Sequence, residues 1–310
     1  MTALLGVLPV LATPFGPNWQ IDAAALQREI DWLFDNGADG LTVAMVSEIQ
    51  RLSHAERAEL NALTCEFSAG RGPVVASVGA ESTYVACQLA RSAAQAGASA
   101  VMAAPPLLAA TPELELRRYL EAIAQAAQCP VILQDASNYV GVPVPVPVQA
   151  ALVRDFGPDQ LLLKPEAAPL GPTLGAIAQA TGGTARMFDG SGGIGLIESH
   201  ARGVVGTMPG PDLVWALRAL WDALQAGDAA LARSIQGPLA GIQAMTVGID
   251  GYVTVEKHLL VRQHVLPHAR MRPPVTFPFD EVSAGCVEDL VAELAARVGR
   301  PPLDPVPADS

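Results

Sequence analysis

Residues 74–103, VVASVGAESTYVACQLARSAAQAGASAVMA, contain one complete strand, helix and strand unit. Two apolar runs, Val74 to Val78 and Ala100 to Ala103, flank an amphipathic stretch. Ser82 is a typical helix N-cap, and Ala96-Gly-Ala-Ser-Ala100 supplies a glycine for the turn from the helix into the second strand. The two runs do not alternate between apolar and polar residues, a pattern typical of parallel strands covered on both faces by helices.

The same unit recurs along the first two thirds of the chain. Short apolar runs alternate with amphipathic stretches of roughly 12 to 16 residues. The eight runs are Gly6 to Thr13, Gly40 to Ala44, Val74 to Val78, Ala100 to Ala103, Val131 to Gln134, Leu161 to Lys164, Ala185 to Asp189 and Val204 to Met208. Eight such units predict an α/β fold, specifically a (β/α)8 TIM barrel over residues 1–208.

A different pattern follows the eighth run. Helical periodicity without strand signals marks residues near 212–226, 228–245, 252–265 and 280–298. We therefore expect a C-terminal helical region over residues 209–299 that closes over or beside the barrel. Residues 300–310 are rich in proline and polar residues, and we expect a loose tail there.

The composition of the 310-residue chain excludes several functional classes. Apolar residues make up 50% of it and charged residues 16%, which excludes a disordered protein. The net charge is −12 and Lys164 and Lys257 are the two lysines, so nucleic acid and anionic membranes are poor partners. The amino terminus lacks a secretory signal and no apolar run reaches the ~18 to 20 residues of a membrane span, so we expect a cytoplasmic protein.

The residues that end the strands are the candidates for chemistry, because the active site of a β/α barrel lies at the carboxyl ends of its strands. Lys164 ends its run in a chain with one other lysine. Inside a barrel, desolvation would favour its neutral amine, a nucleophile toward carbonyl carbon. The alternative is a structural ion pair with Glu166 or Asp189. Glu48, Asp135 and Glu166 are candidates for acid and base work, or residues that hold loops and pair with the lysine.

Neither a metal nor an organic cofactor is predicted. None of the five histidines ends a predicted strand, and no two of the four cysteines form a C-x-x-C pair. Residues 190–195 match the dinucleotide pattern G-x-G-x-x-G, but they follow the seventh strand instead of opening a domain. We expect this segment to offer helix N-terminal amides to an anionic or hydroxylated substrate.

Motifs along most of the chain resemble the dihydrodipicolinate synthase and N-acetylneuraminate lyase family of Schiff-base aldolases and dehydratases. They are Gly6-Val-Leu-Pro-Val-Leu-Ala-Thr-Pro-Phe15, Ala44-Met-Val-Ser-Glu48 with Leu52-Ser53, Ala104-Pro-Pro106, Pro130-Val-Ile-Leu133 with Gly141, Lys164 with Glu166, Asp189-Gly190 and Gly203-Val-Val-Gly206. The resemblance implies that Lys164 forms an imine with a 2-oxo acid and that amides near Val46 and Ser47 hold the substrate carboxylate. It also implies a homodimer or homotetramer.

The chain departs from the family's synthases at residues that move protons. The loop Ala44-Met-Val-Ser-Glu48 has no hydroxyl at its first three positions, where the family carries G-T-T-G-E or G-S-T-G-E. Gln134 replaces the tyrosine that ends the fifth strand, Leu107 and Leu108 replace a tyrosine pair, and Tyr139 replaces an arginine. These departures disfavour an activity like that of 4-hydroxy-tetrahydrodipicolinate synthase.

Three segments resemble the branch of L-2-keto-3-deoxyarabonate dehydratases, namely Gln134-Asp-Ala136, Lys164-Pro-Glu166 and Phe188-Asp-Gly190, although Met45 stands where that branch carries an asparagine. The expected function is therefore dehydration of a 2-keto-3-deoxy sugar acid. The imine would acidify C3, a base among Asp135, Glu166 and a bound water would remove its proton, and the C4 hydroxyl would leave. Alternatives are a retro-aldolase that releases pyruvate and a non-catalytic barrel that binds a metabolite.

The expected site combines these groups. The catalytic candidates are Lys164, Asp135 and Glu166, and the substrate-binding candidates are Val46, Ser47, Glu48, Gln134, Asp189, Gly190 and Met208.

Overall fold

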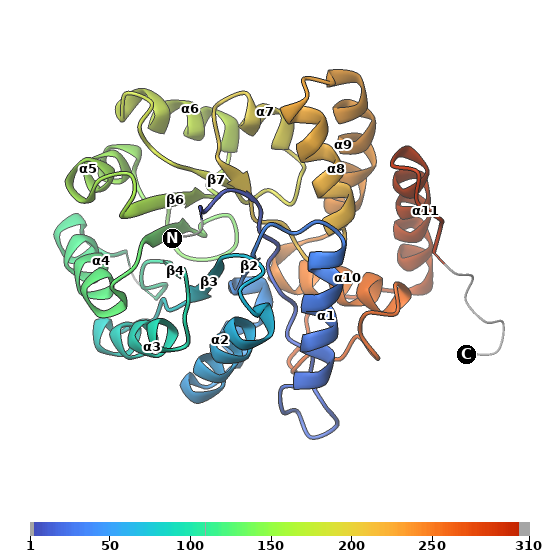
Figure 1. Cartoon of the computed structure of the whole chain (residues 1–310), viewed down its shortest axis with the longest axis horizontal. Helices are drawn as coiled ribbons and strands as arrows, with labels where there is room; N and C mark the ends of the chain where they lie inside the picture. The colour runs from blue at the N-terminus through green and yellow to red at the C-terminus, as the bar shows by residue number, and fades with distance from the viewer. Residues whose placement is uncertain (1–2, 109, 304–310) are drawn as a thin grey trace.

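The computed structural model describes residues 3–108 and 110–303, and in these residues each of the eight predicted runs contributes a strand (Figure 1). The strands are β1 (Gly6–Val7), β2 (Leu41–Thr42), β3 (Val74–Ser77), β4 (Ala100–Ala103), β5 (Val131–Asp135), β6 (Leu161–Pro165), β7 (Phe188–Asp189) and β8 (Gly206–Thr207). Several are shorter than predicted because the chain leaves the hydrogen-bonded ladder early. The ladder between β1 and β8 ends at Val7, for example, and the rest of the first run meets its other neighbour, β2, at a single bridge from Val10 to Thr42.

The strands close into a barrel. Strands β2 to β6 pair in parallel in chain order, and β1, β8 and β7 form a second parallel sheet. The bridge from Val10 to Thr42 joins the two sheets on one side, and a bridge from Leu163 to Met187 joins them on the other. The predicted (β/α)8 barrel is therefore confirmed.

Helices surround the strands (Figure 1). They are α1 (Ala23–Asp35), α2 (His54–Ser68), α3 (Thr83–Gln95), α4 (Glu113–Ala127), α5 (Val146–Phe156), α6 (Leu170–Ala180), α7 (Leu196–His200) and α8 (Val214–Gln225). Ser82 is the N-cap residue of α3, as the sequence predicts. Two short 3-10 helices, η1 (Met45–Ser47) and η2 (Ile49–Arg51), lie in the loop after β2.

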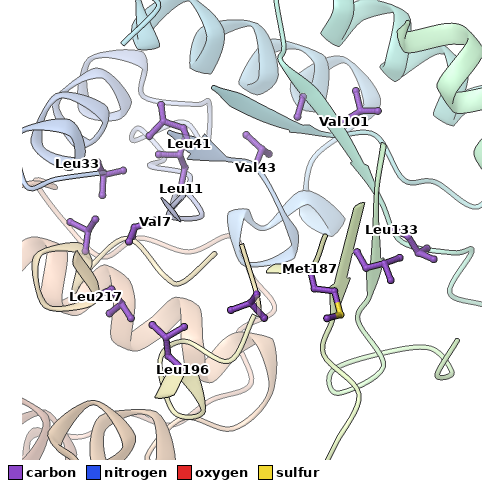
Figure 2. Close-up of a cluster of buried hydrophobic side chains, with 14 of the residues drawn as sticks. Val7, Leu11, Leu33, Leu41, Val43, Val101, Leu133, Met187, Leu196 and Leu217 are labelled. Atoms are coloured by element: carbon purple, nitrogen blue, oxygen red, sulfur yellow. The ribbon is translucent and has the colours of Figure 1, made fainter. Parts of the chain in front are cut away.

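The apolar side chains form an inner and an outer core. Residues that alternate along the strands fill the inside of the barrel, among them Leu8, Val10, Val75, Met102, Ile132, Leu162 and Phe188. The intervening residues, such as Val101, Leu133 and Met187, belong to an outer cluster that also contains helix residues such as Leu33, Leu196 and Leu217 (Figure 2). Because side chains two apart on a strand share a face, the positions that follow Ile132, Leu162 and Phe188 by two residues also face the barrel interior.

In the described residues, the part of the chain after β8 contains helices and no further strand. Its first helix, α8, packs against β1, where the eighth helix of the barrel belongs. The later helices are α9 (Ala229–Ala244), α10 (Gly248–Arg262) and α11 (Glu281–Arg297), and α9 packs against both α8 and α11. Helix α10 contacts η1 and so reaches the end of the barrel where β2 finishes. The predicted tail over 300–310 lies mostly outside the described residues. No helix in the described ranges is long and apolar enough to cross a membrane.

Candidate active site

Lys164 lies at the carboxyl end of β6 and faces the barrel interior, two residues after Leu162. Its Nζ atom is 2.7 Å from Oε1 of Glu166. Gln134, the register partner of Lys164 on β5, donates from Nε2 to the other oxygen of Glu166 at 2.8 Å. All three side chains are buried. The carboxylate of Glu166 is thus held between the ammonium of Lys164 and the side-chain amide of Gln134.

A pocket opens beside this group. It is lined by residues from strand ends, loops and the helical region, namely Val10, Ala44, Met45, Val46, Gln134, Tyr139, Lys164, Glu166, Gly190, Gly192, Met208, Pro209, Gly210, Gln243, Tyr252 and Glu256. Six of the predicted site residues are among them: Val46, Gln134, Lys164, Glu166, Gly190 and Met208. The absence of a side chain at Gly190 is required, because a Cβ there would lie 2.7 Å from Glu166 Oε1 and 3.0 Å from Lys164 Cε.

Asp135 does not line the pocket. It follows Gln134 on β5 and therefore points to the opposite face of the strand. Its Oδ1 accepts a hydrogen bond from the amide of Ser137 at 3.2 Å, and its Oδ2 accepts one from the amide of Val144 at 3.0 Å. Of the two roles considered for Asp135, the geometry favours holding the loop after β5 over acid and base work.

Asp189 is also used structurally. Its Oδ1 accepts hydrogen bonds from the amide and hydroxyl of Ser191, at 3.0 and 2.9 Å. Its Oδ2 accepts one from the hydroxyl of Ser199 at 2.6 Å. Asp189 therefore ties the turn after β7 to the five-residue helix α7, and it is the next residue, Gly190, that borders the pocket.

Ser47 and Glu48 lie behind the pocket wall. The Ser47 amide donates to the carbonyl of Ala44 at 3.0 Å, and its hydroxyl donates to the carbonyl of Leu11 at 2.6 Å. Glu48 is paired with the buried ammonium of Lys257. A 3-10 helix leaves the amides of its first two residues without an intrahelical partner. In η1 these are Met45 and Val46, which both line the pocket, whereas Ser47 does not.

Two tyrosines that the sequence did not identify as site residues also line the pocket. Tyr139 follows β5 and Tyr252 belongs to α10, and their rings make an edge-to-face contact with centroids 5.6 Å apart. Burial, with the nearby charge of Glu166, raises the pKa of Tyr139. The strand-end tyrosine of the family is absent here, but phenol groups reach the same pocket from a loop and from the helical region.

Three buried carboxyl groups, one of them on α10, have raised pKa values. Glu256, next to Lys257, lines the pocket, and burial raises its pKa well above the usual value. Burial also raises the pKa of Asp212 to about 7 and that of Glu29 to about 8. Glu29 lies on α1, where its Oε1 accepts a hydrogen bond from the amide of Ala12 at 2.7 Å.

These raised values predict that the protein loses stability as pH rises from about 5 to 8. A carboxyl group with a raised pKa binds more protons in the folded than in the unfolded state across this window, and each such group lowers the free energy of unfolding by up to about 1.4 kcal/mol per pH unit. Urea unfolding at several pH values should show this decline, and Glu29→Gln should make it shallower.

Glu56→Gln is the control, because the Arg272 guanidinium holds the pKa of Glu56 at about 2 and its titration falls below the window. That variant should keep the wild-type slope even if it is less stable overall. If Glu29→Gln kept the same slope too, the raised pKa of Glu29 would be contradicted.

A metal site finds no support in the described part of the chain, where no three His, Cys, Asp or Glu side chains gather as ligands. The four cysteines are free thiols. The chemistry available in the pocket is that of an amine, two carboxyl groups, two phenols and two side-chain amides.

Known proteins resemble the chain in sequence and in fold. Residues 3–159 match the family described as the dihydrodipicolinate synthetase family. The chain is 33% identical over 155 residues to an L-2-keto-3-deoxyarabonate dehydratase of Azospirillum brasilense, covering 49% of this chain and 50% of that protein. It is 31% identical over 273 residues to 4-hydroxy-tetrahydrodipicolinate synthase 2 of Streptomyces coelicolor, covering 87% of this chain and 88% of that protein.

The coverage and the fold similarity are also informative. The chain spans about half the length of the dehydratase and of several 4-hydroxy-tetrahydrodipicolinate synthases that it matches. Among solved structures, a putative dihydrodipicolinate synthetase from Pseudomonas aeruginosa superposes with a TM-score of 0.86 at 22% identity, covering 94% of this chain and all of that one. The similarity extends through the barrel and the C-terminal helices.

Proposed function

Because the chain belongs to the dihydrodipicolinate synthetase family, we propose that it is a lyase that acts on a 2-oxo acid through an imine on Lys164. The observation that carries the proposal is the buried contact of Lys164 with Glu166 at the end of β6, open to the pocket. A lysine amine held inside a barrel next to a proton acceptor has what imine formation requires, since the neutral amine is the nucleophile.

The residues present support a simple sequence of steps. Glu166 Oε1 is positioned to accept a proton from the Lys164 ammonium, which frees the amine to attack the C2 carbonyl. Glu166 returns this proton to the hydroxyl of the addition product, which leaves as water, and the resulting protonated imine withdraws electrons from C3. Glu166, with its second oxygen held by Gln134, is the candidate base for the C3 proton. Gln134 itself does not titrate and orients the carboxylate.

The substrate carboxylate is expected to face η1, where Met45 and Val46 border the pocket and their amides have no partner within the helix. Among the described residues that line the pocket, Lys164 is the one basic side chain. A substrate with a second carboxylate would have no arginine to receive it there. The hydroxyl groups of Tyr139 and Tyr252 instead suit a substrate with hydroxyls of its own.

We infer that the substrate is a 2-keto-3-deoxy sugar acid, and that the reaction is loss of the C4 hydroxyl as water. A second hollow continues from the pocket toward α6 and α7, and Tyr139, Glu166, Gly190 and Tyr252 border both. The hydroxylated end of a sugar acid has room to extend in that direction. The expected homodimer or homotetramer stays a prediction. Analytical ultracentrifugation, which measures the mass of the assembly in solution, tests it directly.

Product analysis with a 2-keto-3-deoxypentonate tests this assignment. Dehydration keeps all the carbons in one product, whereas aldol cleavage by the same imine releases pyruvate. We expect the dehydrated acid without pyruvate. Release of pyruvate would make the protein a retro-aldolase, and binding of 2-oxo acids without turnover or imine formation would make it a metabolite-binding barrel.

A further inference from the structure

Helix α10 brings a carboxyl group into the pocket that the steps above do not use. Glu256 lies one turn after Tyr252 on α10, so the two side chains share the helix face that lines the pocket. Glu256 is 4% exposed, and its Oε2 atom has no hydrogen-bond partner among the described residues. Since a buried polar atom without a partner is destabilising, its place at a ligand pocket indicates a partner that arrives with the ligand.

The surroundings of Glu256 favour its protonated form. Burial is the largest cause of its raised pKa, followed by the charges of Asp212 and Glu29, while Lys257 and Lys164 oppose the rise. A Cβ on Gly210 would clash with Glu256 Oε1 and lie 2.9 Å from Asp212 Oδ1, so the two carboxyl groups come close together there. Two carboxyl groups at such a site do not both ionise readily, and a protonated carboxyl is a hydrogen-bond donor.

We propose that Glu256 is the general acid of the reaction, the group that protonates the C4 hydroxyl of the substrate as it leaves. The inference rests on the proposed function, because it requires the imine on Lys164. It assigns opposite roles to two carboxyl groups in one pocket. Glu166, in contact with an ammonium and an amide, accepts protons, and Glu256, shielded from solvent and beside Asp212, donates one.

The step balances without a further reactant. When Glu166 takes the C3 proton, the electrons of the C–H bond form the C2–C3 double bond of an enamine. The nitrogen lone pair then re-forms the imine, the C3–C4 double bond forms, and the C4–O bond breaks. The departing oxygen takes the proton of Glu256 and leaves as water. The proton held by Glu166 returns through solvent to Glu256, and hydrolysis of the imine frees Lys164.

The test separates this role from imine chemistry. Exchange of the pyruvate methyl hydrogens in D2O, followed by NMR, needs Lys164 and a base but no leaving group. Dehydration of a 2-keto-3-deoxypentonate needs the acid as well. Glu256→Gln should lower dehydration by about 100-fold or more and change pyruvate exchange by less than about threefold, since a general acid contributes roughly 10²- to 10⁴-fold. Glu256→Asp, which keeps a carboxyl group, should retain more dehydration than Glu256→Gln.

Glu56→Gln is the control, because Glu56 is a carboxyl group that neither lines the pocket nor is among the charges that raise the pKa of Glu256. It should leave both rates near those of the wild-type protein. The inference is overturned if Glu256→Gln lowers exchange and dehydration equally, if it lowers neither, or if the wild-type protein exchanges pyruvate hydrogens but dehydrates no 2-keto-3-deoxy acid. If the wild-type protein itself did not exchange the pyruvate hydrogens, the imine on Lys164 would be refuted instead.

Discussion

Lys164→Ala is expected to abolish exchange of pyruvate methyl hydrogens and to lower turnover of a 2-keto-3-deoxy acid by more than about 1000-fold, because the nucleophile of the reaction is removed. The Lys164 amine is the one basic group among the described pocket residues, so no neighbouring side chain can replace it. Steady-state assays and NMR exchange measure the two losses independently.

A second variant separates the chemistry from the charge. Removing Lys164 leaves the buried carboxylate of Glu166 with Gln134 as its remaining side-chain partner, which is destabilising. Lys164→Arg keeps a positive charge beside Glu166 but cannot provide a neutral amine at ordinary pH. It should be as inactive as Lys164→Ala. Substantial turnover by either folded variant would contradict the proposed mechanism.

Lys257→Met should lower the free energy of unfolding by about 3–5 kcal/mol, because breaking a buried ion pair strands the other charge. Lys257 and Glu48 are both fully buried and in contact. The ammonium also donates to the carbonyl of Thr13 at 2.7 Å and to that of Arg270 at 2.8 Å, and it lies 4.7 Å from the centre of the Phe15 ring. One side chain thus holds α10 to the loops after β1 and β2.

An exposed ion pair provides the comparison. On α4, Nη1 of Arg118 lies 2.7 Å from Oε1 of Glu115, and the two side chains are 63% and 56% exposed, respectively. Arg118→Ala should cost no more than about 1 kcal/mol, since solvent screens such a pair. Urea denaturation of the two variants measures both effects. Equal losses in the two variants would mean that Lys257 does not anchor α10.

The fold was predictable from the sequence because the strand and helix units repeat and each is locally clear. The same regularity located Lys164, Glu166 and Gln134 at strand ends. It does not distinguish strand-end residues that face the pocket from those that face away, so Asp135 and Asp189 stand among the predicted site residues although neither lines the pocket. The alternation of side chains along a strand provides that distinction, since Asp135 follows the inward-facing Gln134 and Asp189 precedes Gly190.

The residues contributed by α10 could not be predicted in the same way. The periodicity of residues 252–265 indicates a helix and its apolar face, but it does not indicate which strand ends the helix crosses. Tyr252 and Glu256 reach the pocket because Lys257 holds α10 against Glu48 after β2, a contact between residues 209 positions apart. In the sequence, Glu256 beside Lys257 is only a weak signal of a functional site. It becomes informative once both side chains are found buried.

Borohydride reduction in the presence of pyruvate, followed by peptide mass spectrometry, tests the central claim most directly. The chain has two lysines, and the ammonium of Lys257 is fully engaged by Glu48 and two carbonyl oxygens. The account predicts a reduced pyruvate adduct on the peptide that contains Lys164 and none on the peptide that contains Lys257. An adduct confined to Lys257, or no adduct on the folded protein with any 2-oxo acid, would contradict it.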